Sequence, residues 1–562
     1  MSRLQAIATL AAVLWGVVSL RAAWLVADGT ELRSAALRQR FTHVAIESTP
    51  GQLVDRRGRV LAISGTRPSV FVDPSRIDDP AEFAAAVAPI VSADADELAA
   101  ALRRHRTQRF RWLRRLTTPQ TVERLRELAL PERTWGVREE RDRFYPQGIA
   151  AAHLLGFRDI DHAAKSGLEK RYAAAMTAEP GERAVVRDAR GRSLAVLQSL
   201  TKDPSPGQTI RLSIDAAVQA IAARELDRLV DRHRPRWAAA VVIDVERSEL
   251  VASETRPTFD PNDPQAAAAN GLNHAFATAF EPGSTMKPFV VARAVDDKLA
   301  SPDEMVDCGD GEAAFGGRTV RDSHPVGRVP LGEVLVESSN IGVSRLVGRF
   351  DRRALWETFD AVGFGRVPRV QPPLGRTGRL RPVSGWTDYS PISHGIGYEL
   401  TVTPVQLAMA YAIIARDGRD APLSLLHDAA IETQPRRVFT SETCRWLRTG
   451  PLADVVSRGT ARAAALPGVP VWGKTGTAQR FDPVKKVYRT DRATAVFAGG
   501  IPAERPRYVA VVVADDPAAG GGGGRVAAPA AIRILRDTDR MHTAGRGSHN
   551  ADGTPLPAAI AR

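Results

Sequence analysis

The chain has 562 residues, of which 44% are hydrophobic and 25% charged, and it carries a formal net charge of +13. At roughly 150 residues per domain this length predicts two to four domains, and the hydrophobic content excludes wholesale disorder. Only two cysteines occur, which excludes a disulfide scaffold, a zinc ribbon and an iron–sulfur cluster. No C-x-x-C or H-E-x-x-H motif is present, so we do not expect a metalloenzyme. The positive charge favours an anionic partner: a nucleic acid, an anionic membrane or an anionic polymer.

The N-terminal segment is apolar. Residues 4–20 carry only mild interruptions, and counting through Val26 gives about 23 residues, enough for a transmembrane helix. We therefore predict a short cytoplasmic tip and a single-pass anchor over residues 1–27, with the bulk of the chain outside the cytoplasm. A cleaved signal peptide ending near Leu25–Ala27 is the alternative, and a buried helix of a soluble protein is a third.

Residues 28–206 show a mixed pattern that predicts a separate domain. Two short strands are expected around the turn at Asp55–Gly58, and helices over 92–104 and 118–130. The densest basic stretch, 103–115, is interpreted as a solvated helix face, with contact to a membrane or partner as the alternative. No nucleic-acid motif accompanies it, so we expect no nucleic-acid partner. A Pro/Gly-containing linker over 202–207 marks the domain boundary.

The second predicted domain covers residues 207–541. It opens with a strand over 209–213 and a helix over 216–232, and a strand pair follows over 237–245 and 249–255. Three further strands are expected near the C-terminus, over 469–478, 494–499 and 508–515, before a helix over 526–540. This order predicts an α/β domain in which one antiparallel sheet draws strands from both ends of the domain. The polar tail over 542–562 is predicted to be disordered.

The segment FEPGSTMKPF places Ser284 three residues before Lys287. On a helix the two side chains face the same way. A serine hydroxyl becomes a strong nucleophile only when a base takes its proton, and a lysine can do so only when it is uncharged. The four-residue pattern alone is weak, because Ser199–Lys202 also matches it, at a site with no expected helix.

Two further motifs follow in order. Ser338 and Asn340 come after a short helical stretch and offer a hydroxyl that can relay a proton and an amide that can hold a peptide group. A second S-x-N pattern, Ser548–Asn550, lies in the tail. Lys474–Thr477 (K-T-G-T) falls on a predicted edge strand, where the lysine and threonines can hold a substrate carboxylate and the glycine leaves room for a substrate backbone.

A phosphate-binding loop is a rival interpretation of this last segment. Gly468–Thr475 fits the pattern G-x-x-x-x-G-K-T. Such a loop needs a preceding strand and a helix immediately after it. The residues after Thr475 are unsuited to starting a helix and those before Gly468 look helical, so the nucleotide-binding interpretation is disfavoured.

The order S-x-x-K, S-x-N, K-T-G resembles the signature of the penicillin-binding proteins and serine β-lactamases. The chain is similar in particular to the class B penicillin-binding proteins, the monofunctional peptidoglycan transpeptidases. The segments that carry this resemblance, besides the three motifs, are DRRGRVLAIS (55–64), RFYPQGIAAAHLLGF (143–157), GLEKRY (167–172) and GYELTVTPVQLA (397–408). It implies a mixed α/β (α+β) transpeptidase fold with a five-stranded antiparallel sheet flanked by helices, carried on an elongated mixed α/β pedestal of the dimerisation type.

The resemblance also implies a reaction. Ser284 would attack a stem peptide ending in D-Ala-D-Ala, with Lys287 as base, and Ser338 and Lys474 would pass the proton to the departing D-Ala. An amine of a neighbouring stem peptide would then resolve the acyl-enzyme and complete a cross-link. β-Lactams would mimic the donor and stop at the acyl stage. No metal or organic cofactor is required.

The same resemblance implies substrate-binding roles. Asn340 would orient the peptide, Thr475 and Thr477 would hold the terminal carboxylate, and Gly476 would leave room beside the strand. The backbone N–H groups of Ser284 and Thr477 would stabilise the oxyanion. One departure from the family is the run Gly520–Gly524, where relatives often carry aromatic residues, which raises the question of the mobility of this loop.

The cellular role is expected to be septal, as in the FtsI-like branch, with an elongation role as the alternative. Expected partners are an FtsW-type glycan polymerase and other division proteins, at the division septum, with the catalytic domain on the periplasmic side of the inner membrane. A D,D-carboxypeptidase or β-lactamase-like hydrolase and a non-catalytic division scaffold are the other functions considered. The acceptor amine is left open. Cys308 and Cys444 could pair outside the cytoplasm, but we favour free thiols.

Overall fold

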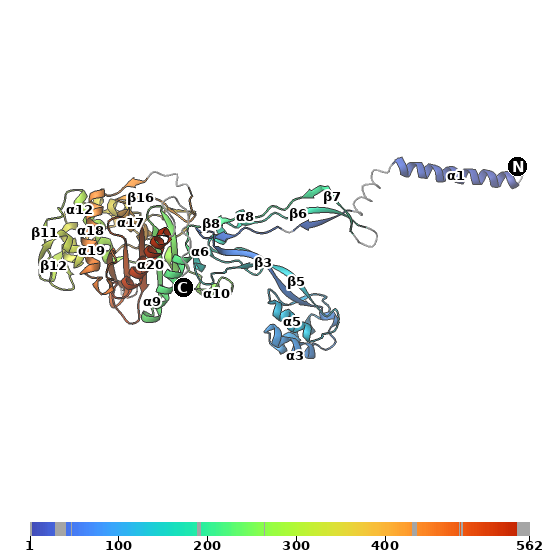
Figure 1. Ribbon diagram of the computed structural model, residues 1–562, viewed down its shortest axis with the longest axis horizontal. Helices are drawn as coiled ribbons and strands as arrows, with labels where there is room; N and C mark the ends of the chain where they lie inside the picture. The colour runs from blue at the N-terminus through green and yellow to red at the C-terminus, as the bar shows by residue number, and fades with distance from the viewer. Residues whose placement is uncertain are drawn as a thin grey trace. The chain divides into compact units, whose positions relative to one another are not determined.

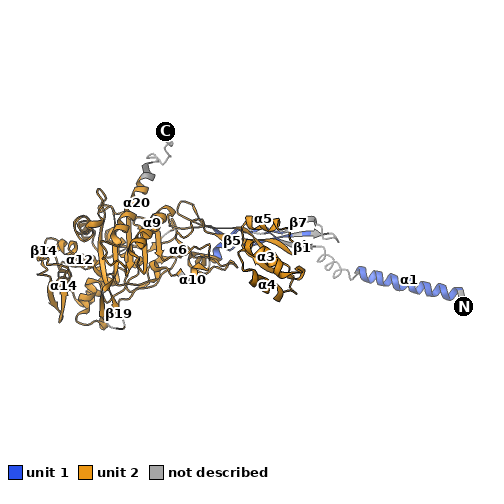
Figure 2. Ribbon diagram, turned by 90° about the horizontal axis from the view of Figure 1, so that it is seen from below, with its two compact units in different colours: residues 1–52, 174–209 blue, residues 53–173, 210–562 orange. Residues whose placement is uncertain are grey.

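The computed structural model describes residues 3–27, 41–46, 48–187, 193–263, 265–429, 435–482, 484 and 487–547. The chain divides into two compact units (Figure 2). Residues 1–52 and 174–209 form unit 1, and residues 53–173 and 210–562 form unit 2. Residues 53–173 thus belong with the C-terminal part of the chain, whereas the predicted boundary at residue 206 separates them from it. The predicted domain boundaries stay a prediction.

Unit 1 contains one long apolar helix and a small sheet. The helix, α1 (Arg3–Ala27), includes a span over Leu4–Val26 that is long and apolar enough to cross a membrane, the segment predicted from the sequence. Strands β1 (Phe41–Ile46), β6 (Gly181–Arg187) and β7 (Ser193–Lys202) form an antiparallel sheet in the order β1-β6-β7. The chance motif Ser199–Lys202 therefore lies on a strand, as its lack of helical pattern indicated.

The N-terminal part of unit 2 packs three helices against a twisted sheet (Figure 1). The sheet contains β2 (Leu53–Val54), β3 (Val60–Val72), β4 (Arg111–Arg114), β5 (Trp135–Phe144) and β8 (Ile210–Arg211). The helices are α3 (Pro80–Val91), α4 (Ala95–Arg104) and α5 (Pro119–Glu127), and their apolar faces share a core with β3. Helix α3 was not predicted. It ends at Ser92 in the left-handed region, and α4 begins only after Asp94, whose carboxylate caps it.

The basic stretch 103–115 is not the single helix face predicted for it. Arg103 and Arg104 end α4, and Arg111–Arg114 form β4. Strand β4 forms because Trp112 and its neighbour Phe110 pack against Phe71 of β3, with ring centroids 4.9–6.5 Å apart. This packing across strands outweighs the helical preference of the local sequence.

The C-terminal part of unit 2 is built on a larger sheet. Strands β9 (Trp237–Asp244), β10 (Glu249–Arg256), β19 (Trp472–Asp482), β20 (Val487–Ile501) and β21 (Tyr508–Asp515) follow the order β10-β9-β21-β20-β19 with antiparallel pairing throughout. This confirms the predicted five-stranded antiparallel sheet and the position of the K-T-G segment on an edge strand. Two-residue strands β17 (Leu423–Ser424) and β15 (Val370–Gln371) extend the other edge with parallel pairing.

Helices cover this sheet. Helices α9 (Ala216–His233) and α20 (Ala527–Gly547) pack on each other and on the sheet, and they share a large core of Ala, Val and Leu side chains with its strands. Helix α17 (Pro404–Ala415) also packs against β9 and β21 and is nearly all buried. The predicted helices over 216–232 and 526–540 are confirmed.

The prediction that the disordered tail begins at residue 542 places its start too early in the chain, because helix α20 ends at Gly547. Helix α20 continues through His542 to Gly547, where Tyr508 and His542 are in contact and Arg507 pairs with Asp539. These contacts to β21 and the loop before it hold the last turns of the helix. Residues 548–562, which include the chance motif Ser548–Asn550, lie outside the described residues.

The remaining elements are short and mostly connect or flank the sheets. The helices among them are α6 (Ala152–Leu155), α7 (Gly167–Arg171), α8 (Ala173–Met176), α10 (Ala266–Asn270), α11 (His274–Ala277), α12 (Lys287–Asp296), α13 (Leu331–Val336), α14 (Asn340–Val347), α15 (Arg352–Ala361), α16 (Ser390–Ile396), α18 (Ser441–Thr449) and α19 (Pro451–Ser457). The strands are β11 (Met305–Asp307), β12 (Glu312–Phe315), β13 (Arg318–Arg321), β14 (Arg328–Pro330), β16 (Arg419–Asp420) and β18 (Arg436–Arg437). The two cysteines, Cys308 and Cys444, are buried and unpaired, which confirms the expectation of free thiols.

An ion-paired turn joins the two parts of unit 2. Asp55 is fully buried between β2 and β3 and accepts the N–H of Ala216 at the start of α9, over 3.1 Å. Arg59 bridges Asp55 and Asp215, with both nitrogen–oxygen distances 2.6 Å. Arg56 reaches Glu249 of β10 over 2.6 Å. The DRRG segment therefore attaches the N-terminal part of unit 2 to the sheet that carries the site described next.

Candidate active site

Ser284 and Lys287 lie where a tight turn enters a helix. A 3-10 turn over Gly283–Met286 leads directly into α12, so Ser284 sits in the turn and Lys287 starts the helix. Gly283 adopts a φ of +55°, and a Cβ there would lie 3.3 Å from Ala478 of β19. Glycine thus allows this turn to lie close against the edge strand.

Lys287 is fully buried and hydrogen-bonded to the second motif. Its Nζ donates to the Ser338 carbonyl oxygen over 2.5 Å and to Asn340 Oδ1 over 2.7 Å, and it lies 3.4 Å from Ser338 Oγ. Burial lowers the pKa of Lys287 to about 7, because desolvation penalises the ammonium form. None of these three contacts of Lys287 Nζ is to Ser284. In structures without substrate, hydrogen bonds between the groups of an active site are often long or poorly aligned.

Lys474 contacts the same serine from β19. It is fully buried on β19, and its Nζ donates to Ser338 Oγ over 3.0 Å and to the Thr475 carbonyl oxygen over 3.2 Å. Burial, together with the nearby Lys287, lowers the pKa of Lys474 well below its ordinary value. Ser338 itself has a φ of +60°, an uncommon conformation for a residue with a side chain.

Asp322 holds the Ser338–Asn340 turn in place, and sequence reasoning missed it. Its carboxylate accepts the Ser339 hydroxyl and the Asn340 N–H, both over 2.5 Å, and the Ile341 N–H over 3.2 Å. These N–H groups begin α14 and have no partner within the helix. No motif marks Asp322 in the sequence, because it follows the short strand β13 and meets the turn only in the folded chain.

The predicted site residues converge on one cavity of about 410 Å³. Its lining includes Ser284, Ser338, Asn340, Thr475 and Thr477. The two lysines lie beside it, hydrogen-bonded to Ser338. All three motifs are therefore brought together, and the rival phosphate-loop interpretation is wrong, because β19 continues from Trp472 to Asp482 and no helix follows the segment.

The packing of the protein itself requires a glycine at position 476. A Cβ at this position would lie 2.7 Å from the Pro282 carbonyl oxygen and 3.0 Å from Thr285 Cγ2. The absent side chain therefore lets the Ser284 turn pack directly on β19. Tyr411 of α17 supports the same turn by donating its hydroxyl to the Thr285 carbonyl oxygen over 2.9 Å.

The second half of the glycine run 520–524 packs beside the cavity, which Gly522 and Gly524 line. Gly523 N–H donates to Thr477 Oγ1 over 3.1 Å. A Cβ on Gly522 would lie 2.3 Å from Thr477 Oγ1, and one on Gly523 would lie 2.1 Å from the Val496 carbonyl oxygen. The second half of the run is thus packed against β19 and β20.

The comparisons with known proteins agree with this geometry. Residues 238–536 match the family described as penicillin binding protein transpeptidase domain, and residues 45–212 match the penicillin-binding protein dimerisation domain. The probable peptidoglycan D,D-transpeptidase PenA of Neisseria gonorrhoeae is 32% identical over 472 residues, which cover 83% of this chain and 80% of the relative. The peptidoglycan D,D-transpeptidase FtsI of Escherichia coli is 31% identical over 498 residues, covering 87% and 82%.

A solved structure shares the fold. Penicillin binding protein 3 from Mycobacterium tuberculosis, complexed with aztreonam, aligns with a TM-score of 0.66 and 24% identity, covering 89% of this chain and 97% of that one. The chain belongs to the class B penicillin-binding proteins, which combine a dimerisation domain with a transpeptidase domain. The resemblance inferred from the motifs is confirmed.

Proposed function

We propose that the chain is a serine-type peptidoglycan D,D-transpeptidase that cross-links stem peptides. The observation that carries this proposal is the convergence of two buried lysines, Lys287 and Lys474, on the hydroxyl of Ser338 in the cavity lined by Ser284. The names of the relatives, peptidoglycan D,D-transpeptidases, support the reaction class.

In the first half-reaction Ser284 Oγ attacks the carbonyl carbon of the penultimate D-Ala. Lys287, which has a pKa near 7, takes the hydroxyl proton in its neutral form. The peptide C–N bond breaks, and the leaving D-Ala amine receives a proton relayed through Ser338 and Lys474. The backbone N–H groups of Ser284 and Thr477 stabilise the oxyanion.

The donor is held along the edge strand. Thr475 and Thr477 bind its terminal carboxylate, and Asn340 orients its peptide group. In the second half-reaction an amine of a neighbouring stem peptide attacks the Ser284 ester, so that a new amide forms and the serine hydroxyl is restored. A β-lactam enters as the donor does and stays attached as a stable ester.

The cellular setting completes the proposal. Helix α1 anchors the chain in the inner membrane with unit 2 on the periplasmic side, at the division septum. Residues 28–206 act as a pedestal that docks an FtsW-type glycan polymerase and other division proteins. The apolar span of α1 and the FtsI relative support this setting.

A covalent-labelling experiment tests the proposal. The full chain in detergent is incubated with a fluorescent penicillin, and the adduct is located by intact mass and peptide mapping. We expect one adduct on the peptide containing Ser284 that lasts for many minutes. Ser284→Ala should abolish it, while Ser199→Ala, which removes the serine of the chance motif, should not. Rapid release of the adduct would indicate a hydrolase, and no adduct on the folded chain would indicate a non-catalytic scaffold.

A further inference from the structure

The basic stretch 103–115 has no role in the candidate active site. Arg106 and Arg109 lie in the loop between α4 and β4, and Arg111 and Arg114 lie on β4. Arg106, Arg109 and Arg114 are exposed, and Arg111 is half-buried. None of these four arginines has a carboxylate partner in the part of the chain that the structure describes.

Carboxylates nearby are taken up by other arginines. Arg115, which ends the stretch, pairs with Glu140 over 2.9 Å and with Asp161 over 2.8 Å. Asp142, on the same strand as Glu140, pairs with Arg67 over 3.2 Å. These carboxylates are therefore engaged, and the four arginines remain available to a partner molecule.

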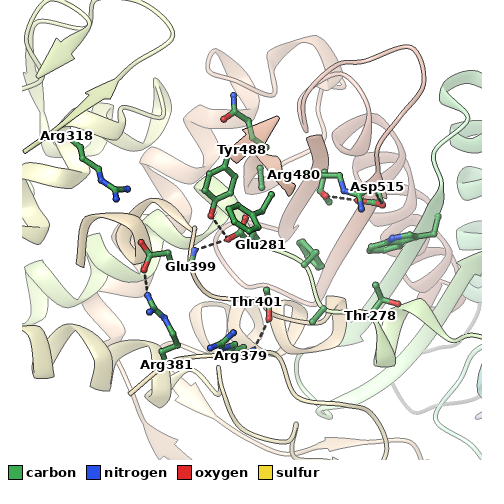
Figure 3. Close-up of a pocket in the computed structure, with 17 residues that line it drawn as sticks. Thr278, Glu281, Arg318, Arg379, Arg381, Glu399, Thr401, Arg480, Tyr488 and Asp515 are labelled. Atoms are coloured by element: carbon green, nitrogen blue, oxygen red, sulfur yellow. Dashed lines mark hydrogen bonds and ion pairs between the residues drawn. The ribbon is translucent and has the colours of Figure 1, made fainter. Parts of the chain in front are cut away.

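A cavity of about 750 Å³ close to the active site shows a different arrangement (Figure 3). Two of the four arginines that line it pair with carboxylates of the same lining: Arg381 with Glu399, and Arg480 with Asp515 over 3.2 Å. There the fold itself neutralises part of the positive charge. The segment 106–114 lacks this compensation, and an acidic partner would supply it.

Three aromatic side chains lie beside these arginines. Phe110 stacks on Phe71 of β3 with ring centroids 4.9 Å apart, and it meets Trp112 of β4 edge-on at 4.8 Å. The side chains that flank Phe71 on β3 belong to the core shared with the helices, so the aromatic cluster lies on the other face of the sheet. Gly136 of β5 leaves room for Phe71, since a Cβ there would lie 2.6 Å from its ring. Phe110 is 42% exposed, and the cluster is open to a partner.

Strand β4 also has a free edge. Residues 70–72 of β3 pair with β4 along one side and with residues 135–137 of β5 along the other. Strand β4 pairs with no second strand among the described residues. The unpaired edge of a strand presents N–H and C=O groups to which an extended peptide can add.

We propose that β4 and the loop before it bind an acidic segment of a partner protein, which adds to the free edge of β4 as an extended strand. Its carboxylates meet Arg106, Arg109, Arg111 and Arg114, and an apolar side chain packs on the aromatic cluster. Arginine and aromatic residues are enriched where proteins bind each other. An anionic membrane would meet the arginines but leave the backbone groups of the strand edge unused, so a peptide fits this surface better. The inference rests on the pedestal role in the proposed function and names its surface and partner chemistry.

The test measures binding of a fluorescent twelve-residue peptide of alternating Glu and Val to the full chain in uncharged detergent, by anisotropy at low salt. We expect the affinity to fall as salt is added, because the contacts are between exposed charges. The triple variant Arg106→Ala, Arg109→Ala, Arg111→Ala should bind roughly tenfold more weakly, as the loss of three exposed ion pairs implies. A peptide with Pro in place of Val keeps the charge but lacks half of the backbone donors, and it should also bind at least about tenfold more weakly.

The matched control removes the same charge elsewhere. Arg328→Ala, Arg419→Ala, Arg505→Ala replaces three exposed arginines outside this surface and should keep the wild-type affinity. Equal weakening in both triple variants, equal binding of the proline peptide, or no binding at about 1 mM peptide would each overturn the inference.

Two further measurements separate the alternatives. Micelles doped with phosphatidylglycerol replace the peptide, and binding to them that depends on Arg106, Arg109 and Arg111, without peptide binding, would assign the surface to a membrane and overturn the inference. Penicillin labelling reports the active site independently. Failure of peptide binding in a chain that penicillin labels overturns only this inference, whereas a folded chain without labelling overturns the proposed function.

Discussion

Lys287 and Lys474 both contact one hydroxyl: Lys287 Nζ lies 3.4 Å and Lys474 Nζ 3.0 Å from Ser338 Oγ. Both lysines are fully buried. Two ammonium groups that contact the same hydroxyl in a buried site repel each other strongly, because little water screens their charges. The site therefore disfavours the state in which both carry a proton. In its neutral form Lys287 can accept the hydroxyl proton of Ser284, as the proposed mechanism requires.

The rate of acylation by penicillin should rise with pH through about 7 and then level off. Burial lowers the pKa of Lys287 from 10.5 to about 7, so the lysine is protonated below that pH and neutral above it. Its surroundings include Asp322, Cys308 and Lys474. The measurement is the second-order acylation constant between pH 5.5 and 9, with a β-lactam whose own charge is constant over this range. A flat profile would contradict the role of Lys287 as base.

Replacing Asp322 should slow acylation by roughly 10- to 100-fold, because misplacing a catalytic group by about 1 Å costs this much. Asp322→Ala removes the acceptor for Ser339 and Asn340 and releases the turn that positions Ser338. Asp322→Asn keeps one acceptor oxygen and should recover part of the rate. The control is Asp310→Asn, at an exposed carboxylate nearby in the chain, and equal rates in Asp322→Ala and this control would refute the role of Asp322.

Gly523→Ala should destabilise the wall of the cavity by about 1–3 kcal/mol and slow acylation. The new Cβ would lie 2.1 Å from the Val496 carbonyl oxygen and 2.5 Å from that of Gly476, and both are backbone atoms of paired strands. Gly385→Ala is the matched control, because its Cβ meets nothing within 4 Å. Thermal unfolding and penicillin labelling of the two variants measure the difference. An unchanged unfolding temperature and labelling rate in Gly523→Ala would show that the backbone around Gly523 can shift at little energetic cost.

Arg56→Ala should lower the free energy of unfolding by about 3 kcal/mol, because it removes the guanidinium that Glu249 and Asp244 share in a largely buried site. Arg57→Ala removes an arginine that is half exposed and should cost less than about 1 kcal/mol. The two thermal unfolding curves provide the comparison. A similar shift in both would mean that burial of the Arg56 pair contributes little.

The sequence predicted those parts of the molecule whose chemistry is local. The motifs around Ser284, Ser338 and Lys474 identify the site because these residue types occur in a fixed order along the chain. The local sequence also placed the five strands that form the antiparallel sheet. The helix start at Thr118 followed from its capping residue. That all three motifs meet at one cavity was implied by the family resemblance and not by any local pattern.

What the sequence did not predict depends on contacts between distant segments. Asp322 acquires its role from the turn at Ser339–Asn340, and β4 forms because Trp112 meets Phe71. Helix α20 extends past Arg540 because Arg507 and Tyr508 contact its last turns. In each case the partner lies too far away in the chain for periodicity or capping to reveal it.

The packed glycines have a consequence for drug resistance. Gly522 and Gly524 line the cavity, Gly523 lies between them, and a Cβ on any of the three would meet protein atoms 2.1–2.3 Å away, so this part of the wall consists of backbone. A single substitution there cannot insert a side chain that blocks an inhibitor without also displacing β19 or the segment at Thr460. Inhibitors that make hydrogen bonds to this stretch of main chain would therefore contact a surface that point mutation can alter only at a cost to the enzyme's own stability.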